Sequence, residues 1–70
     1  MFKYRVESPN IYSIGYDSET KLLEIDYNSG RICRYQNVPL IDYQRLSAAR
    51  NKENYVDRYI RDSYIQIAEG

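Results

Sequence analysis

The stretch of sequence that decides the fold is residues 22–35, LLEIDYNSGRICRY. Leu23, Ile25 and Tyr27 alternate with acidic residues, which is the period-two pattern of a β-strand with one buried face. Residues 28–30, Asn-Ser-Gly, then suit a three-residue hairpin turn in which the glycine takes a positive φ angle. Because the alternation and the turn agree, the sequence predicts an antiparallel hairpin here.

The turn also determines which residues of the hairpin face each other. One face pairs Leu23 with Tyr35, Ile25 with Cys33 and Tyr27 with Arg31. On the other face Glu24 lies opposite Arg34, which is a favourable pair of opposite charges. Asp26 shares this face with Glu24, and two carboxylates can hold a metal ion or act on a sugar. Since Arg34 neutralises Glu24, we expect instead a solvated, charge-paired surface with no metal.

Alternation over residues 2–6 and 11–16 predicts two further strands, which residues 7–10 separate with turn-forming side chains. In the second of these strands, Tyr12 and Tyr16 are expected on the buried face.

Two helices are predicted after the hairpin. Pro39 suits the first turn of a helix that runs to about Ala49. Asn51 is expected to end this helix, and Asn54 to cap the next. The stripe of the second helix consists of Tyr55, Val56, Tyr59, Ile60 and Ser63. Residues 64–67 are expected to add a short last strand.

These elements predict an α+β fold class, in which a small antiparallel sheet of four to five strands, a meander, packs against two short C-terminal helices. Residues 1–70 are expected to form a single domain. A domain this small is marginally stable and often needs disulfides, metals or self-association. Cys33 is the only cysteine and histidine is absent, so neither a disulfide nor a zinc site is expected. We therefore expect a homodimer.

Tyrosine supplies almost all of the aromatic bulk, with nine tyrosines beside one phenylalanine and no tryptophan. A tyrosine buries a large apolar ring while its hydroxyl keeps a hydrogen-bond partner, both in cores and at interfaces. The patterns above assign six rings to the core, namely Tyr12, Tyr16, Tyr27, Tyr35, Tyr43 and Tyr59. Tyr4, Tyr55 and Tyr64 are left as candidates for the surface.

The sequence offers little for catalysis. Acid–base chemistry at neutral pH most often uses histidine, and Cys33 alternates with core residues, so we expect an inert thiol, no enzyme and no cofactor. No apolar run approaches the roughly 20 residues of a membrane span, and the start of the chain lacks the apolar stretch of a secretory signal. A cytoplasmic location and no membrane partner are therefore expected.

The ten acidic and ten basic residues cancel, but they are unevenly distributed. Residues 7–30 hold five acidic residues against one lysine, whereas residues 31–61 hold seven basic residues against three acidic ones. The candidates for partner binding are tyrosines and arginines of the second half, namely Arg34, Tyr35, Tyr55, Arg58, Arg61 and Tyr64. Both residue types are enriched in protein–protein hot spots, and aromatic rings beside arginines can also stack the bases of single-stranded RNA.

Landmarks along residues 8–64 resemble those of the KTSC domain, a module named for its occurrence at the C-terminus of some lysyl-tRNA synthetases. Stand-alone versions of the module occur in bacteria and their phages. The matching positions are Ser8, Asn10, Ile11, Ile14-Gly15-Tyr16-Asp17, Leu23-Glu24-Ile25-Asp26-Tyr27, Gly30, Tyr35, Val38-Pro39, Tyr43, Leu46, Ala48, Tyr55 and Ile60-Arg61. The family's Tyr-x-Tyr, Ser-x-Gly and Tyr-Phe-Asn differ here, reading Cys33-Arg34-Tyr35, Asn51-Lys52-Glu53 and Tyr55-Val56-Asp57.

The resemblance implies a domain without catalytic residues, for which RNA binding has been suggested because the domain occurs attached to some lysyl-tRNA synthetases. Two hypotheses for function follow. The first is a non-catalytic interaction module that regulates or inhibits a larger protein partner, for example as a phage-encoded anti-host or anti-defence protein. The alternative is an RNA-binding module that uses tyrosine stacking and arginine–phosphate contacts, and its binding would weaken steeply with salt.

Overall fold

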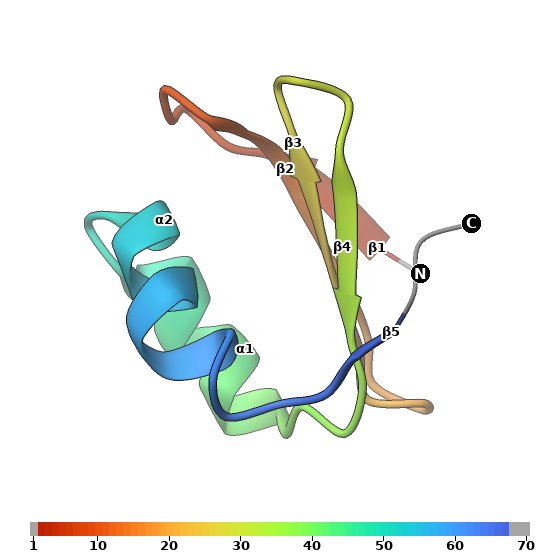
Figure 1. The fold of residues 1–70 in the computed structure, drawn as a ribbon. Helices are drawn as coiled ribbons and strands as arrows, with labels where there is room; N and C mark the ends of the chain where they lie inside the picture. The colour runs from red at the N-terminus through yellow and green to blue at the C-terminus, as the bar shows by residue number, and fades with distance from the viewer. Residues whose placement is uncertain (1, 68–70) are drawn as a thin grey trace.

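The computed structural model describes residues 2–67, except the side chain of Phe2, and contains a five-stranded antiparallel sheet with helices on one face (Figure 1). The strands are β1 (Phe2–Arg5), β2 (Ile11–Asp17), β3 (Leu22–Tyr27), β4 (Ile32–Tyr35) and β5 (Gln66–Ile67), and they lie in this order across the sheet. The helices are α1 (Leu40–Ala48), α2 (Lys52–Tyr55) and a π-helical turn, η1 (Val56–Ile60), that continues α2. The predicted α+β class and antiparallel meander are confirmed.

The β3–β4 hairpin has the predicted register. Leu23 lies opposite Tyr35, and Ile25 lies opposite Cys33. At the turn, the backbone N–H of Tyr27 donates to the carbonyl of Arg31 at 2.8 Å. Gly30 has a φ angle of +95°, a backbone conformation in which a side chain would be strained.

A β-bulge in β2 changes the predicted faces of that strand. Ile11 lies opposite Tyr27 while Ser13 lies opposite Asp26, so Tyr12 is an extra residue without a partner in the register. Such a bulge interrupts the alternation of side chains. The prediction that Tyr12 lies in the core is therefore wrong: its side chain is 49% exposed, and the Arg5 guanidinium lies 3.8 Å from its ring centroid.

The core lies between the sheet and the helices. Ile14, Leu23, Ile25, Cys33 and Tyr35 supply it from the strands, and Leu46, Val56 and Ile60 supply it from the helices. Each buried aliphatic side chain of this kind stabilises the fold by roughly 1.5–3 kcal/mol. The two layers are also joined where the Tyr16 ring stacks on Tyr43, with centroids 4.7 Å apart.

The caps of the helices differ from the prediction at one point. The Asn51 side chain accepts a hydrogen bond from the N–H of Asn54 at 3.0 Å, so Asn51 caps the start of α2 and Asn54 lies inside it. The chain had already left α1 at Ala49, whose backbone is extended. One residue can therefore follow one helix and cap the next.

Helix geometry also explains where the tyrosines of the second helix lie. Val56 and Ile60 are fully buried, and the π-helical turn ends where the N–H of Arg61 donates to the carbonyl of Val56 at 2.8 Å. Tyr59 is 53% exposed, so its prediction as a core residue is wrong. The core space that it was expected to fill is taken by Ile60. Three rings predicted for the surface, Tyr4, Tyr55 and Tyr64, are instead half-buried and pack against the core.

Candidate functional site

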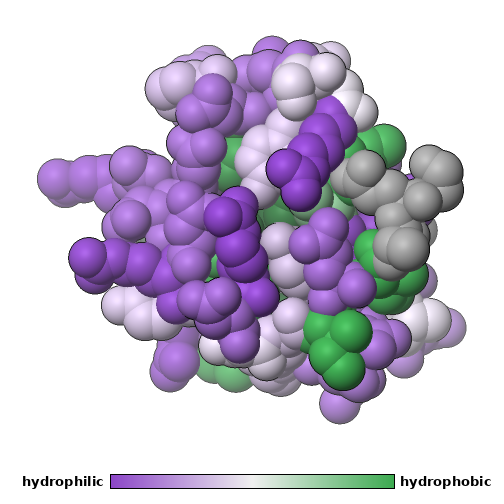
Figure 2. All heavy atoms as spheres, viewed as in Figure 1, coloured by the Kyte–Doolittle hydropathy of each residue, from purple (hydrophilic) through white to green (hydrophobic). Residues whose placement is uncertain are grey.

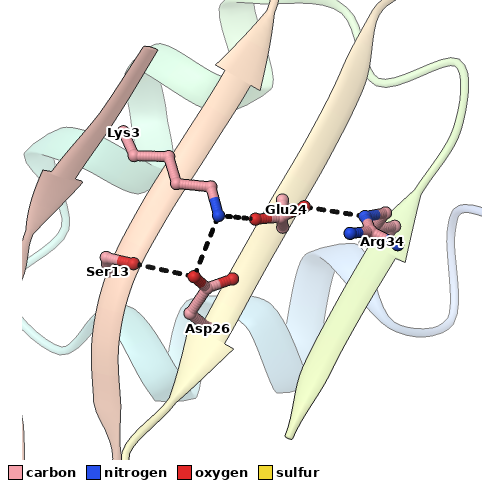
Figure 3. Close-up of polar contacts among 5 residues, drawn as sticks. All are labelled: Lys3, Ser13, Glu24, Asp26 and Arg34. Atoms are coloured by element: carbon pink, nitrogen blue, oxygen red, sulfur yellow. Dashed lines mark hydrogen bonds and ion pairs between the residues drawn. The ribbon is translucent and has the colours of Figure 1, made fainter. Parts of the chain in front are cut away.

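A network of charged side chains covers the sheet face that carries no helices (Figure 3). Glu24 on β3 lies at its centre, ion-paired with Lys3 of β1 and with Arg34 of β4, whose Nε lies 2.7 Å from Glu24 Oε1. Lys3 Nζ also lies 3.1 Å from Asp26 Oδ2, and the Ser13 hydroxyl donates to the same oxygen at 3.2 Å. The network therefore links four neighbouring strands.

The electrostatics of Glu24 identify this network as structural. Its side chain is only 3% exposed, so the expectation of a solvated face is wrong here, although the expected pairing with Arg34 is confirmed. Burial by itself raises the pKa of Glu24, but hydrogen bonds from Lys3 and Arg34 outweigh it and lower the pKa to about 2. A carboxylate held ionised by two cations is a poor proton donor. No group of three or more potential metal ligands occurs within the described residues.

The predicted partner-binding residues do not form one surface. Arg34 lies on the helix-free face of the sheet, bound to Glu24. Arg58 belongs to η1 and Arg61 follows it, on the side of the sheet that the helices cover. Tyr35 is 1% exposed and lies in the core, so it offers no ring for stacking. The combined tyrosine–arginine surface predicted for RNA is therefore not formed.

Tyr55 and Tyr64 take part in packing around Asp42 of α1. The Tyr64 hydroxyl donates to Asp42 Oδ2, and burial together with this hydrogen bond raises the pKa of Tyr64 to about 12. The Tyr55 ring contacts Tyr59, with centroids 4.8 Å apart and planes tilted by 43°. Tyr64 thereby attaches the segment after η1 to the start of α1.

A polar pocket of about 380 Å³ lies between the β3–β4 turn and the end of the helical region. We call it the turn pocket. Its lining residues are Asn10, Tyr27, Asn28, Ser29, Arg31, Glu53 and Arg61. It contains one predicted site residue, Arg61, beside a second arginine that the prediction did not include.

Several contacts hold the walls of the turn pocket. The N–H of Asn28 donates to the carbonyl of Asn10 at 2.7 Å, and its side-chain amide donates to the carbonyl of Pro9 at 2.9 Å. Across the pocket, Asn10 Nδ2 donates to Glu53 Oε1 at 2.8 Å. These bonds connect the β3–β4 turn, the β1–β2 loop and α2.

Arg61 is held by an ion pair at the edge of the turn pocket. Its Nη2 lies 2.9 Å from Asp57 Oδ1 one helical turn earlier. Burial raises the pKa of Tyr27 and of Tyr35, and the positive charge of the nearby Arg61 guanidinium acts against burial at both phenols. The π-helical turn just before Arg61 sets the position from which its guanidinium reaches these groups, and such turns frequently occur at functional sites.

A second pocket of about 380 Å³ lies between the β1–β2 loop and the loop that joins α1 to α2. Its charged residues are Glu7, Arg50, Lys52 and Glu53, so its charges balance. It shares Glu53 with the turn pocket. A balanced set of charges gives no preference for an ionic ligand.

Exposed apolar side chains gather near the start of α1. Leu40 and Ile41 are 49% and 50% exposed, and Ile65 is 67% exposed. The N–H of Gln36 donates to the carbonyl of Ile65 at 3.1 Å, and the chain after η1 passes the start of α1 on its way to β5 (Figure 1). Leu40, Ile41 and Ile65 form what we call the α1 surface, because the Tyr64–Asp42 hydrogen bond holds the segment of Ile65 beside the start of α1. By contrast, hydrophilic residues cover most of the face seen in Figure 2.

Sequence reasoning missed both the turn pocket and the α1 surface. The Asn28–Gly30 turn and the adjacent Arg31 were visible as a local signal, but Asn10 and Glu53 reach the pocket from distant parts of the chain. Likewise, Leu40 and Ile65 are apolar residues that a sequence pattern would place in the core as readily as on the surface.

A family model for the KTSC domain matches residues 7–64. The chain belongs to the KTSC family. A crystal structure of a KTSC domain protein from Yersinia pestis has the same fold, with a TM-score of 0.91 and 29% sequence identity over 99% of this chain and 97% of that one. An uncharacterized protein of Stutzerimonas stutzeri (strain A1501) is 38% identical over 39 residues, and the match covers 56% of this chain and 55% of that protein. The predicted resemblance to the KTSC domain is confirmed.

None of the helices in residues 2–67 of this KTSC domain is long and apolar enough to cross a membrane.

Proposed function

We propose that this KTSC domain is a non-catalytic interaction module that binds a larger protein, which it regulates or inhibits, through the α1 surface. The observation that carries the proposal is the group of exposed apolar side chains at Leu40, Ile41 and Ile65. Exposed apolar side chains that lie together are typical of interaction sites, whereas single ones need no explanation. A cytoplasmic location and a homodimeric state are part of the same proposal.

The chemistry of the rest of the domain supports a role without catalysis. Cys33 is buried, and ion pairs hold the carboxylates of the sheet face. RNA binding is the alternative hypothesis, but Arg34 lies on the opposite face of the sheet from Arg61, so the geometry favours a protein partner.

The test is affinity capture with the tagged domain, scored for both protein and RNA by mass spectrometry and sequencing. We expect one protein to be recovered in an amount comparable with the domain itself. Ile41→Glu and Ile65→Glu should each reduce recovery at least tenfold, because a charge would be buried in the interface. Tyr12→Glu is the matched control, since Tyr12 is equally exposed but lies in the bulge of β2, and it should bind normally.

Two results would contradict the proposal. One is recovery of RNA in place of protein, with binding that weakens steeply as salt increases. The other is equal recovery by all three variants. Sedimentation of the domain alone is the companion measurement, because self-association through the same surface would appear as a dimer that Ile41→Glu dissociates.

A further inference from the structure

The turn pocket has the size and the chemistry of a small-ligand site, and it is separate from the α1 surface. Its volume of about 380 Å³ lies at the lower end of the range of roughly 300–1,000 Å³ that is usual for ligand pockets. Its walls come from the β1–β2 loop, the β3–β4 turn and the helical region, and hydrogen bonds join these three segments to one another. The pocket is therefore largely formed before a ligand arrives.

The lining is rich in hydrogen-bond donors. Arg31 and Arg61 supply guanidinium groups, Asn10 and Asn28 supply side-chain amides, and Ser29 supplies a hydroxyl. Guanidinium groups donate to phosphate and carboxylate oxygens in bidentate pairs. A phosphate monoester has three terminal oxygens and a charge close to −2, so it can use more of these donors than a carboxylate can.

Arg61 is positioned for this role before binding. The ion pair with Asp57, in which Nη2 lies 2.9 Å from Oδ1, restrains its side chain, and the Tyr27 phenol lines the same pocket. A restrained side chain loses less conformational entropy when a ligand binds.

Glu53 supplies a hydrogen-bond acceptor for a second group of the ligand. Its Oε1 accepts a hydrogen bond from Asn10 at 2.8 Å, which fixes its carboxylate in the pocket wall. A carboxylate repels a bare anion but accepts hydrogen bonds from hydroxyl or amino groups. We propose that the turn pocket binds a small phosphate monoester that also carries such donors, with the phosphate on Arg31 and Arg61 and the donors on Glu53.

The test is an NMR titration of the isotope-labelled domain with inorganic phosphate, adenosine 5′-monophosphate and acetate, at constant pH and ionic strength. We expect saturable shifts of the Arg31 and Arg61 side-chain signals and of the Asn28 amide, with the nucleotide binding more tightly than phosphate and phosphate more tightly than acetate. Arg61→Gln should weaken nucleotide binding tenfold or more, as expected for loss of a charged hydrogen-bonding partner. The matched control is Arg58→Gln, because Arg58 is exposed on η1 outside the pocket, and its effect should be less than twofold.

If Arg61→Gln does not fold, Arg31→Gln is the second variant to test, and it should weaken nucleotide binding by the same factor of ten. The proposal is overturned if none of the probes gives a saturable shift, or if Arg58→Gln weakens binding as much as Arg31→Gln does. Acetate binding as tightly as phosphate would overturn the choice of ligand class, and a nucleotide no tighter than phosphate would overturn the role of Glu53. Ile41→Glu should leave these titrations unchanged, so failure here and failure of the proposed protein interaction are distinguishable.

Discussion

Replacing Glu24 by glutamine should remove a large and pH-dependent part of the stability of this domain. A carboxyl pKa lowered from the ordinary 4.5 to about 2 corresponds to about 3 kcal/mol of folding free energy at neutral pH. Lys3 and Arg34 are 43% and 36% exposed, so solvent screens part of their interaction with Glu24. We therefore expect Glu24→Gln to lower the free energy of unfolding by about 2 kcal/mol at pH 7.

The sign of the pH dependence follows from the direction of the pKa. Because the pKa of Glu24 is lower in the folded state than in the unfolded chain, its stabilising effect is complete above pH 4.5 and is lost as the pH falls toward 2. The native and Glu24→Gln domains should therefore differ most at neutral pH and converge in acid.

Urea denaturation followed by circular dichroism, from about pH 2.5 to pH 7, measures this difference. Glu19→Gln is the matched control, since Glu19 is exposed in the β2–β3 loop, and its effect should stay within about 0.5 kcal/mol. A cost of Glu24→Gln that is the same at both ends of the pH range would refute the reasoning, as would a cost at pH 7 no larger than that of the control.

Three further predictions test other parts of the structure. Tyr64→Phe should lower the free energy of unfolding by about 1.5–3 kcal/mol, because it removes a hydrogen bond to the charged Asp42. In the native domain, stability should fall between pH 10 and about 12, because the phenol of the unfolded chain ionises at lower pH than that of the folded domain. Titration of the tyrosine absorbance measures this ionisation. Gly30→Ala should cost about 1–2 kcal/mol in urea denaturation, since its φ of +95° strains any side chain although nothing lies within 4 Å of an added Cβ. Ile14→Ala should lower the free energy of unfolding by about 2–5 kcal/mol, and Tyr12→Ala should lower it much less. Equal losses of stability in thermal or urea unfolding would contradict the β2 bulge.

The hairpin could be predicted from the sequence because all of its determinants are local. Alternation in β3, the Asn-Ser-Gly turn and the opposite charges of Glu24 and Arg34 lie within 14 consecutive residues and agree with one another. The bulge at Tyr12 could not be predicted, because alternation continues through residues 11–16 whether or not the pairing slips by one residue. Which register is formed depends on the partner strand, and in particular on Asp26 accepting the hydrogen bond of Ser13.

The candidate sites were less predictable because they combine residues from distant segments. Burial of Glu24 requires Lys3 of β1 to lie across β2, which no local pattern specifies. The arginines of the second half are close in sequence, but β4 points Arg34 away from the helices whereas Arg61 follows a turn packed on the other face. The distribution of charges along a sequence therefore does not predict which face of the fold carries them.

Tyrosine is abundant because it does two structural tasks in a domain without a disulfide. Tyr16 donates its hydroxyl to the carbonyl of Val38 at 2.5 Å, and Tyr4 shares a hydrogen bond of 2.9 Å with Ser47 of α1. In each case the ring fills space between the sheet and the helical layer while the hydroxyl satisfies a polar group on the far side. Phenylalanine would fill the same space but forfeit a hydrogen bond worth about 1 kcal/mol.

The abundance of tyrosine in the composition is therefore a property of the core. Most of the tyrosine rings are at least half-buried, and Tyr12 and Tyr59 are the two among residues 2–67 that reach about half exposure. Side chains already engaged in packing have little left to offer a ligand. We therefore expect binding at the aliphatic residues of the α1 surface, where apolar area faces outward, and at the arginines that line the turn pocket.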